Sequence, residues 1–117
     1  MTIDEFYLEV GGEYSAVLGR LMTDQRILKF IAKFPGAKDY SEFKEALAAE
    51  DYPTAFRAVH SLKGVCLNLE FGNLARSSSV VCELMRPGVK PEIDISGLVA
   101  DIDRDYRATL EAIGKLL

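Results

Sequence analysis

The chain has 117 residues, with 14 basic and 18 acidic side chains, two cysteines and one histidine. A chain of this length buries roughly 65% of its unfolded surface and needs no disulfide or metal to fold, so we expect residues 1–117 to form one domain. The net charge of −4, spread over both signs, argues against a nucleic-acid surface and against a polybasic membrane patch.

The first third of the chain predicts three helices. Thr2-Ile3-Asp4-Glu5 fits a capping box, and Gly11-Gly12 end the short helix that it begins. A second short helix is predicted from Glu13 to Leu21. Thr23 is a typical N-cap for the third helix, which ends at Pro35-Gly36.

Two further helices follow. Asp39 or Ser41 begins the first of them, and Asp51 caps the next one, which carries the histidine. Pro53 falls in the first turn of this helix, where a missing N–H does no harm. Phe71-Gly72 then break the chain.

Two longer helices complete the chain. Small and apolar side chains at helical spacing predict the buried side of the first: Leu74, Ser78, Val81 and Met85. A loop is predicted through Pro87-Gly88 to Pro91. The longest apolar stripe follows it: Ile95, Leu98, Val99, Ile102, Tyr106, Leu110, Ile113 and Leu117. Because no segment alternates as a half-buried strand does, we predict an all-α protein, an antiparallel up-and-down four-helix bundle with additional short N-terminal helices.

Several features of the sequence argue against a zinc-binding, a membrane-spanning or a secreted protein. Cys66 and Cys82 are too few and too far apart for a zinc site, and each falls on an apolar stripe, so we expect buried free thiols. No apolar stretch approaches the ~20 residues that span a bilayer, and the acidic start Met1–Glu5 is unlike a signal peptide. We therefore expect a cytoplasmic protein.

The only histidine, His60, lies in the run His60-Ser61-Leu62-Lys63-Gly64. At about 100° of rotation per residue, the buried stripe of this helix lies about 200° away from it: Ala55, Ala58, Leu62, Val65, Cys66 and Leu69. Four residues lie within about 60° of the histidine on the helix: Arg57, Lys63, Gly64 and Leu67. The imidazole is therefore predicted to face water, beside two cations and a glycine.

This pattern has a chemical interpretation. An exposed imidazole offers a neutral nitrogen that can form a covalent phosphoryl intermediate, and the Lys63 ammonium one turn away can neutralise phosphoryl oxygens. Gly64 leaves room for another protein, although a glycine inside a helix costs about 1 kcal/mol relative to alanine. A solvated surface histidine is the alternative interpretation.

The segment from Ala58 to Leu69 resembles the signature of histidine-containing phosphotransfer (HPt) domains, in which H-x-L-K-G is followed by small residues and an Asn-Leu pair. The whole chain, 1–117, resembles a single domain of this family. Glu70 stands where the family usually has a glycine, with Gly72 two positions later, and this departure concerns the end of the helix. Val65 and Cys66 stand where Ser or Ala is common; both fall on the buried side and affect packing.

The resemblance implies a four-helix bundle and a role in a two-component phosphorelay. His60 would accept a phosphoryl group, at Nε2 because that nitrogen projects furthest from the helix, and exchange it with the aspartate of response-regulator receiver domains. Lys63 would stabilise the phosphoryl oxygens and Gly64 would admit the partner. The chain has no nucleotide-binding motif, so it is expected to be no enzyme, to need no cofactor of its own and to use carboxylates and Mg²⁺ supplied by the receiver.

The neighbours of His60 suggest where a partner docks. Phe56 and Leu67 fall next to the histidine on the outward face, where we interpret them as an apolar collar with Arg57 at its rim. The alternatives are that Phe56 packs against a neighbouring helix and that Arg57 is simply solvated. We expect a monomer whose partners are receiver domains, a sensor histidine kinase, or both.

The sequence also bears on two other functions. A helical adaptor that binds receiver-like partners without carrying phosphate remains open, although such a binder has no use for His60, Lys63 and Gly64 together. A metal-dependent hydrolase is disfavoured because ligand spacing such as H-x-x-x-H is absent. Similar domains occur alone and within larger kinases; the start at Met1 favours a free-standing protein.

Overall fold

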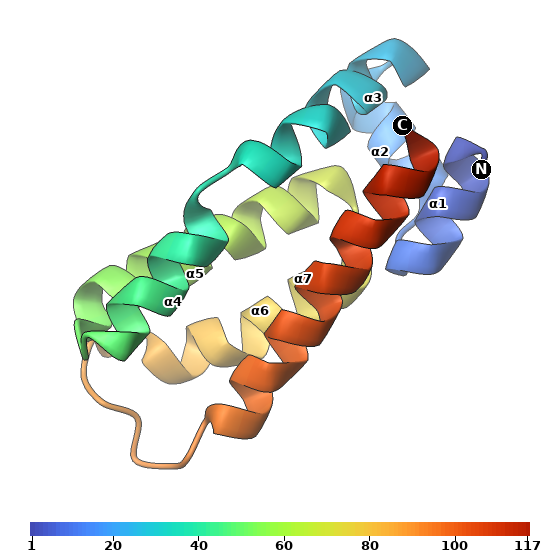
Figure 1. The fold of residues 1–117 in the computed structure, drawn as a ribbon. Coiled ribbons are helices and arrows are strands. Elements are labelled where there is room, and N and C mark those ends of the chain that lie inside the picture. The colour runs from blue at the N-terminus through green and yellow to red at the C-terminus, as the bar shows by residue number, and fades with distance from the viewer.

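The computed structural model describes all residues, 1–117, and contains seven α-helices, one short 3₁₀ turn and no β-strand. The helices are α1 (Ile3–Val10), α2 (Tyr14–Leu21), α3 (Asp24–Lys33), α4 (Asp39–Ala48), α5 (Tyr52–Leu69), α6 (Gly72–Met85) and α7 (Ser96–Leu116), and the 3₁₀ turn η1 is Phe34–Gly36. The all-α prediction is confirmed (Figure 1). No helix combines the length and the apolar character that crossing a membrane requires.

The predicted helix starts are found where the capping residues lie. The Thr2 side chain accepts a hydrogen bond from the Glu5 backbone N–H, and the Glu5 carboxylate accepts one from the Thr2 N–H, which completes the capping box of α1. At the starts of α3 and α5, the Thr23 and Asp51 side chains each accept one hydrogen bond, from the backbone N–H of Arg26 and Thr54. These side chains satisfy backbone donors that have no partner inside the helix.

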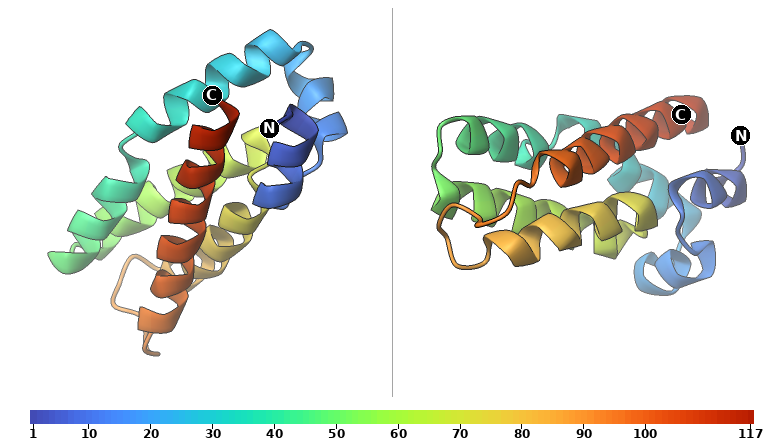
Figure 2. Two further views of the ribbon diagram at one scale, coloured as in Figure 1. Left: turned by 45° about the vertical axis from the view of Figure 1, so that its right-hand side comes forward. Right: turned by 90° about the horizontal axis from the view of Figure 1, so that it is seen from below.

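Helix α5 lies at the centre of the packing. It contacts α4 on one side and α6 on the other, and α6 in turn contacts α7. Figure 2 shows α1 and α2 at one end of the molecule, near the carboxyl end of α7, so that both chain termini lie at the same end. Tyr40 of α4 stacks on Tyr106 of α7 with ring centroids 3.8 Å apart, and this contact joins α4 to α7.

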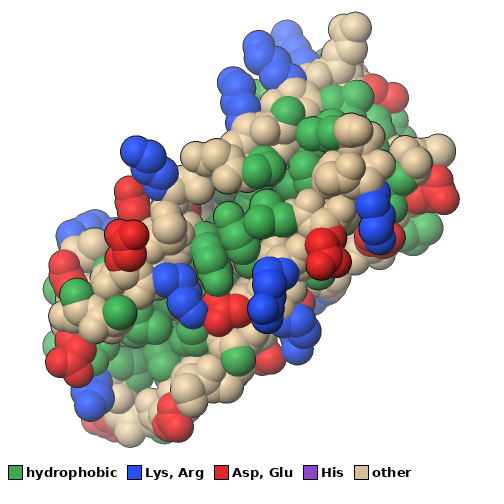
Figure 3. All heavy atoms as spheres, viewed as in Figure 1, with side chains coloured by type: hydrophobic (Ala, Val, Ile, Leu, Met, Phe, Trp, Pro, Cys, Tyr) green, Lys and Arg blue, Asp and Glu red, His purple; other side chains and the backbone are tan.

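One hydrophobic cluster of 26 buried residues draws on all seven helices. Charged side chains of both signs surround hydrophobic atoms on the face formed by α3, α4 and α7 (Figure 3). Most predicted core residues belong to the cluster, but Leu117, predicted on the stripe of α7, is 61% exposed. It follows the last helical residue, so no element covers it. Val65 is only half-buried, whereas Val59, outside the predicted stripe, is fully buried, because α5 packs between two helices and buries more than one stripe.

The end of α5 explains the departure at Glu70. The helix ends at Leu69, and Glu70 adopts a left-handed conformation with φ 60°, the conformation that glycine tolerates best. The following turn passes close to the turn between α1 and α2. A Cβ on Gly12 would lie 1.8 Å from the Glu70 carbonyl oxygen, and one on Gly72 would lie 2.0 Å from that of Gly11. Glycine is thus needed in both turns.

Candidate functional site

His60 lies on the outward face of α5, and its side chain is exposed, as predicted. Its imidazole makes no hydrogen bond with any other group of the protein. The residues that flank it toward the interior, Ala58, Val59 and Leu62, are buried and anchor this part of the helix. The ring nitrogens are therefore free to meet a reagent that arrives from solvent.

Lys63 lies one turn after His60 on the same helix. Its side chain is 24% exposed, and its ammonium Nζ lies 4.0 Å from the Glu83 carboxylate of α6. The aliphatic part of the side chain is thus covered while the charge stays at the surface. The cation is held beside α6 rather than free in solvent.

Glu83 in α6 and Arg86 at the end of this helix lie beside Lys63 and Phe56, and the sequence alone did not point to them. The Arg86 guanidinium donates two hydrogen bonds to the Glu83 carboxylate, 2.6 and 3.2 Å long. Hydrogen bonding by Arg86 holds the pKa of Glu83 below its ordinary value, and the charges of Arg86, Lys63 and His60 act in the same direction. The i,i+3 spacing of the pair is visible in the sequence, but its position beside His60 depends on how α6 packs against α5.

Phe56 lies between the histidine and the arginine. Its ring centroid is 5.7 Å from that of His60, with the planes inclined by 41°, and the Arg86 guanidinium lies 5.5 Å from the same centroid, a distance typical of a cation–π contact. The side chain is half-buried and packs against the core. Phe56 thus packs against a neighbouring helix and also lies against the ring of His60. Packing between helices and a place beside the histidine are both found for this side chain.

Gly64 leaves an open surface beside the histidine. A Cβ built on Gly64 would have no atom within 4 Å, so the glycine is not required by packing inside the chain. Gly12 and Gly72 differ in this respect, since backbone atoms crowd both. The open space is available to another molecule.

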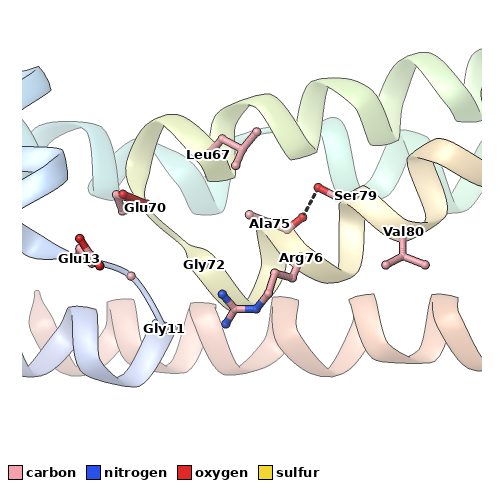
Figure 4. Close-up of a pocket in the computed structure, with 10 residues that line it drawn as sticks. Gly11, Glu13, Leu67, Glu70, Gly72, Ala75, Arg76, Ser79 and Val80 are labelled. Carbon is pink, nitrogen blue, oxygen red and sulfur yellow. Dashed lines mark hydrogen bonds between the residues drawn. The ribbon is translucent and has the colours of Figure 1, made fainter.

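Leu67 continues the same face of α5 toward its carboxyl end and is 51% exposed. It borders a groove of about 550 Å³ between α5, α6 and the turn after α1. Figure 4 shows Leu67 on α5, Ala75 and Val80 on α6, and Glu70 where α5 ends. The histidine face is therefore continuous with a partly apolar groove.

Arg57 is exposed and lies one turn before His60. Its guanidinium donates a hydrogen bond of 3.1 Å to the Thr54 hydroxyl, toward the beginning of the helix. Arg57 is thus on the rim of the histidine face and does not contact the Glu83–Arg86 pair.

Arg20 of α2 holds the carboxyl end of the histidine helix. Its guanidinium donates hydrogen bonds of 3.1 and 3.2 Å to the carbonyl oxygens of Leu67 and Asn68. These carbonyls belong to the last turn of α5, where backbone acceptors lack the i+4 partner of a continuing helix; the Leu67 carbonyl also accepts a hydrogen bond of 3.4 Å from the Glu70 N–H. The N-terminal helices therefore support the part of α5 that carries Leu67.

No cluster of three or more His, Cys, Asp and Glu side chains is arranged to bind a metal ion. Cys66 and Cys82 are both buried free thiols, as predicted, and burial raises the pKa of each. Neither thiol is placed as a reactive group.

Comparison with known proteins identifies one family. A family model described as Hpt domain matches residues 36–113, about two thirds of the chain, from η1 to nearly the end of α7. No curated protein and no solved structure matches the chain. Helices α1 and α2 and all of α3 lie outside the matched residues.

Proposed function

The chain belongs to the Hpt domain family, and on this premise we propose that His60 accepts and returns phosphoryl groups in a two-component phosphorelay. The observation that carries the proposal is the exposed imidazole of His60, which has no partner within the chain and lies beside the Lys63 cation and the open surface at Gly64. The partners are receiver domains of response regulators, a sensor histidine kinase, or both.

The proposed exchange is a direct phosphoryl transfer. The lone pair of His60 Nε2 attacks the phosphorus of an aspartyl phosphate on the receiver, so that an N–P bond forms as the P–O bond breaks. The electron pair of the broken bond leaves with the receiver's aspartate, which becomes a carboxylate. The reverse step returns the phosphoryl group to a receiver aspartate.

Lys63 and Gly64 have separate roles in this proposal. Lys63 neutralises charge on the phosphoryl oxygens, since its ammonium is already held near the surface beside His60. Gly64 admits the partner, because an added side chain would occupy the open space there. The receiver supplies the carboxylates and Mg²⁺ that complete the site, and this chain acts as an intermediate rather than as an enzyme.

The partner docks on the surface that surrounds His60. We assign Phe56 and Leu67 as its apolar contacts and Arg57 as a charged contact at the rim; the exposure of Leu67 supports this assignment. A Leu67→Ala variant is expected to keep its helical content and to transfer phosphate more slowly. An unchanged transfer rate would remove Leu67 from the docking surface.

The proposed architecture is the antiparallel up-and-down bundle of four helices, α4 to α7. Three contacts support this arrangement: α5 packs between α4 and α6, α6 packs on α7, and Tyr40 stacks on Tyr106. The protein works as a monomer in the cytoplasm, where receiver domains are phosphorylated.

A transfer experiment tests the function. The protein is incubated with a receiver domain that carries a ³²P-labelled aspartyl phosphate. The expected result is an acid-labile, base-stable label on the wild-type chain and none on a His60→Gln variant. Binding of the receiver without any label on the wild type would instead identify the non-phosphorylated adaptor.

A further inference from the structure

The carboxylate of Glu83 occupies the cationic surroundings that a phosphoryl group on His60 would need. It lies 4.0 Å from Lys63 Nζ and receives two hydrogen bonds from Arg86. Both cations are therefore paired with the same internal anion while His60 is unmodified, and together the three side chains keep a net charge of +1. Arg86 is further fixed by its contact with the Phe56 ring, which also lies against the histidine.

Phosphorylation of His60 would place a second anion among the same groups. A phosphoryl group carries close to two negative charges, and it would compete with Glu83 for Lys63 and Arg86. Glu83 and the phosphoryl group would also repel one another, because His60 already lies close enough for its charge to act on the Glu83 carboxylate and like charges within a Debye length interact even in the presence of salt. The phosphorylated state is thereby raised in free energy relative to the unmodified state.

We propose that Glu83 is a positioning residue that sets the phosphoryl-transfer equilibrium, by holding Lys63 and Arg86 in the unmodified protein and so keeping the group on His60 easy to transfer. The inference rests on the proposed phosphorelay function. It assigns to Glu83 an effect on the relative free energies of the two states of His60, and no contact with the reacting atoms.

The equilibrium constant is a suitable readout for this role. A change in docking alters forward and reverse rates equally, and a change in fold stability leaves the exchange between folded proteins unaffected. Only a difference between the phosphorylated and unmodified forms of the chain moves the distribution of phosphate between His60 and a given receiver. The measurement is the fraction of ³²P on each protein after the exchange has reached equilibrium.

A Glu83→Gln variant removes the charge and keeps the shape. The equilibrium is expected to shift toward phosphorylated His60 by about threefold to tenfold, and by less at high salt, because the charges are screened there. The Glu83 side chain is 58% exposed, so the variant is expected to fold. Glu83→Asp, which retains the charge, is expected to stay closer to the wild type. Arg86→Gln is expected to shift the equilibrium in the opposite direction, toward the receiver.

The matched control is Glu9→Gln. Glu9 also pairs with a lysine, Lys115, at 3.3 Å. Glu9 lies on α1 and Lys115 on α7, away from His60, so this variant should leave the equilibrium unchanged. Two results would overturn the inference while leaving the phosphorelay function intact. One is an equilibrium for Glu83→Gln equal to that of the wild type, and the other is a shift for Glu83→Asp as large as that for Glu83→Gln. A wild-type chain that takes up no label would instead remove the proposed function itself.

Discussion

The guanidinium of Arg20 lies 3.6 Å from the carboxylate of Glu70, across the gap between α2 and the end of the histidine helix. The same guanidinium caps two carbonyl oxygens of the last turn of α5, where the helix dipole places partial negative charge. A residue outside the segment that matches the Hpt family thus stabilises the helix that carries the proposed phosphorylation site.

An Arg20→Ala variant is expected to lower the free energy of unfolding by about 1–2 kcal/mol, because charge-assisted hydrogen bonds to two carbonyls at the end of α5 are lost. Urea unfolding followed by circular dichroism measures the change. Arg26→Ala is the control, since the Arg26 side chain is exposed and makes no hydrogen bond or ion pair; it should stay within about 0.5 kcal/mol of the wild type. Equal losses for the two variants would show that the cap contributes nothing.

Glu50 and Glu70 both follow the end of a helix, but only Glu70 has an ionic partner. Comparing the two residues therefore separates the effect of the ion pair from the effect of backbone strain. Glu50 and Glu70 have φ angles of 57° and 60°, and glycine relieves such a conformation by about 1 kcal/mol. Glu50 has no ionic partner, so Glu50→Gly should stabilise the protein by about this amount. Glu70→Gly should stabilise it less, because the interaction with Arg20 is lost. Identical shifts in Tm would indicate that the ion pair is without effect.

Gly12 and Gly19 should respond in opposite directions to the same substitution. In Gly12→Ala the new Cβ would meet the Glu70 carbonyl oxygen at 1.8 Å, and separating the two turns is expected to destabilise the protein by about 1–3 kcal/mol. Gly19 lies within α2 with open space around it, so Gly19→Ala should stabilise it by up to about 1 kcal/mol. Thermal unfolding of both variants provides the comparison.

Gly64→Ala should separate stability from function. The added methyl group meets no atom of the protein, so helix propensity should raise the free energy of unfolding by up to about 1 kcal/mol, while the rate of phosphoryl transfer falls because the methyl group intrudes on the docked partner. Gly114→Ala, in α7 and likewise in open space, is expected to leave the transfer rate unchanged. A Gly64→Ala variant with wild-type transfer kinetics would contradict the role of Gly64 in partner access.

Asp51 should make the stability of the histidine helix dependent on pH. Hydrogen bonding by Thr54, through its side chain and its backbone N–H, lowers the pKa of Asp51 from its ordinary value. A depressed pKa contributes stability that is present above the unfolded-state pKa, about 4, and is lost as the pH falls through the folded-state value. Asp51→Asn should therefore lose less stability than the wild type on acidification below about pH 4. Asp51→Ala, which lacks the cap, should be less stable at every pH. Parallel acid profiles for wild type and Asp51→Asn would contradict this account.

Local sequence determined most of the helix boundaries. Thr2, Thr23 and Asp51 supply cap oxygens within three residues of the donors they serve, and such short-range hydrogen bonds can be predicted from spacing alone. The outward position of His60 could be predicted for the same reason, because rotation per residue along one helix places it opposite a buried stripe. The exposure of Leu67 follows from the same rotation.

The tertiary structure alone decided what surrounds the histidine. Glu83 and Arg86 reach its vicinity from α6, Arg20 reaches the end of α5 from α2, and Val59 is buried because two helices enclose α5. These relationships depend on how separate helices pack, and the period of a single helix contains no information about which neighbour covers which side. The nucleophile could therefore be found from the sequence, whereas the charges proposed to set its equilibrium could be found only after the helices had been placed together.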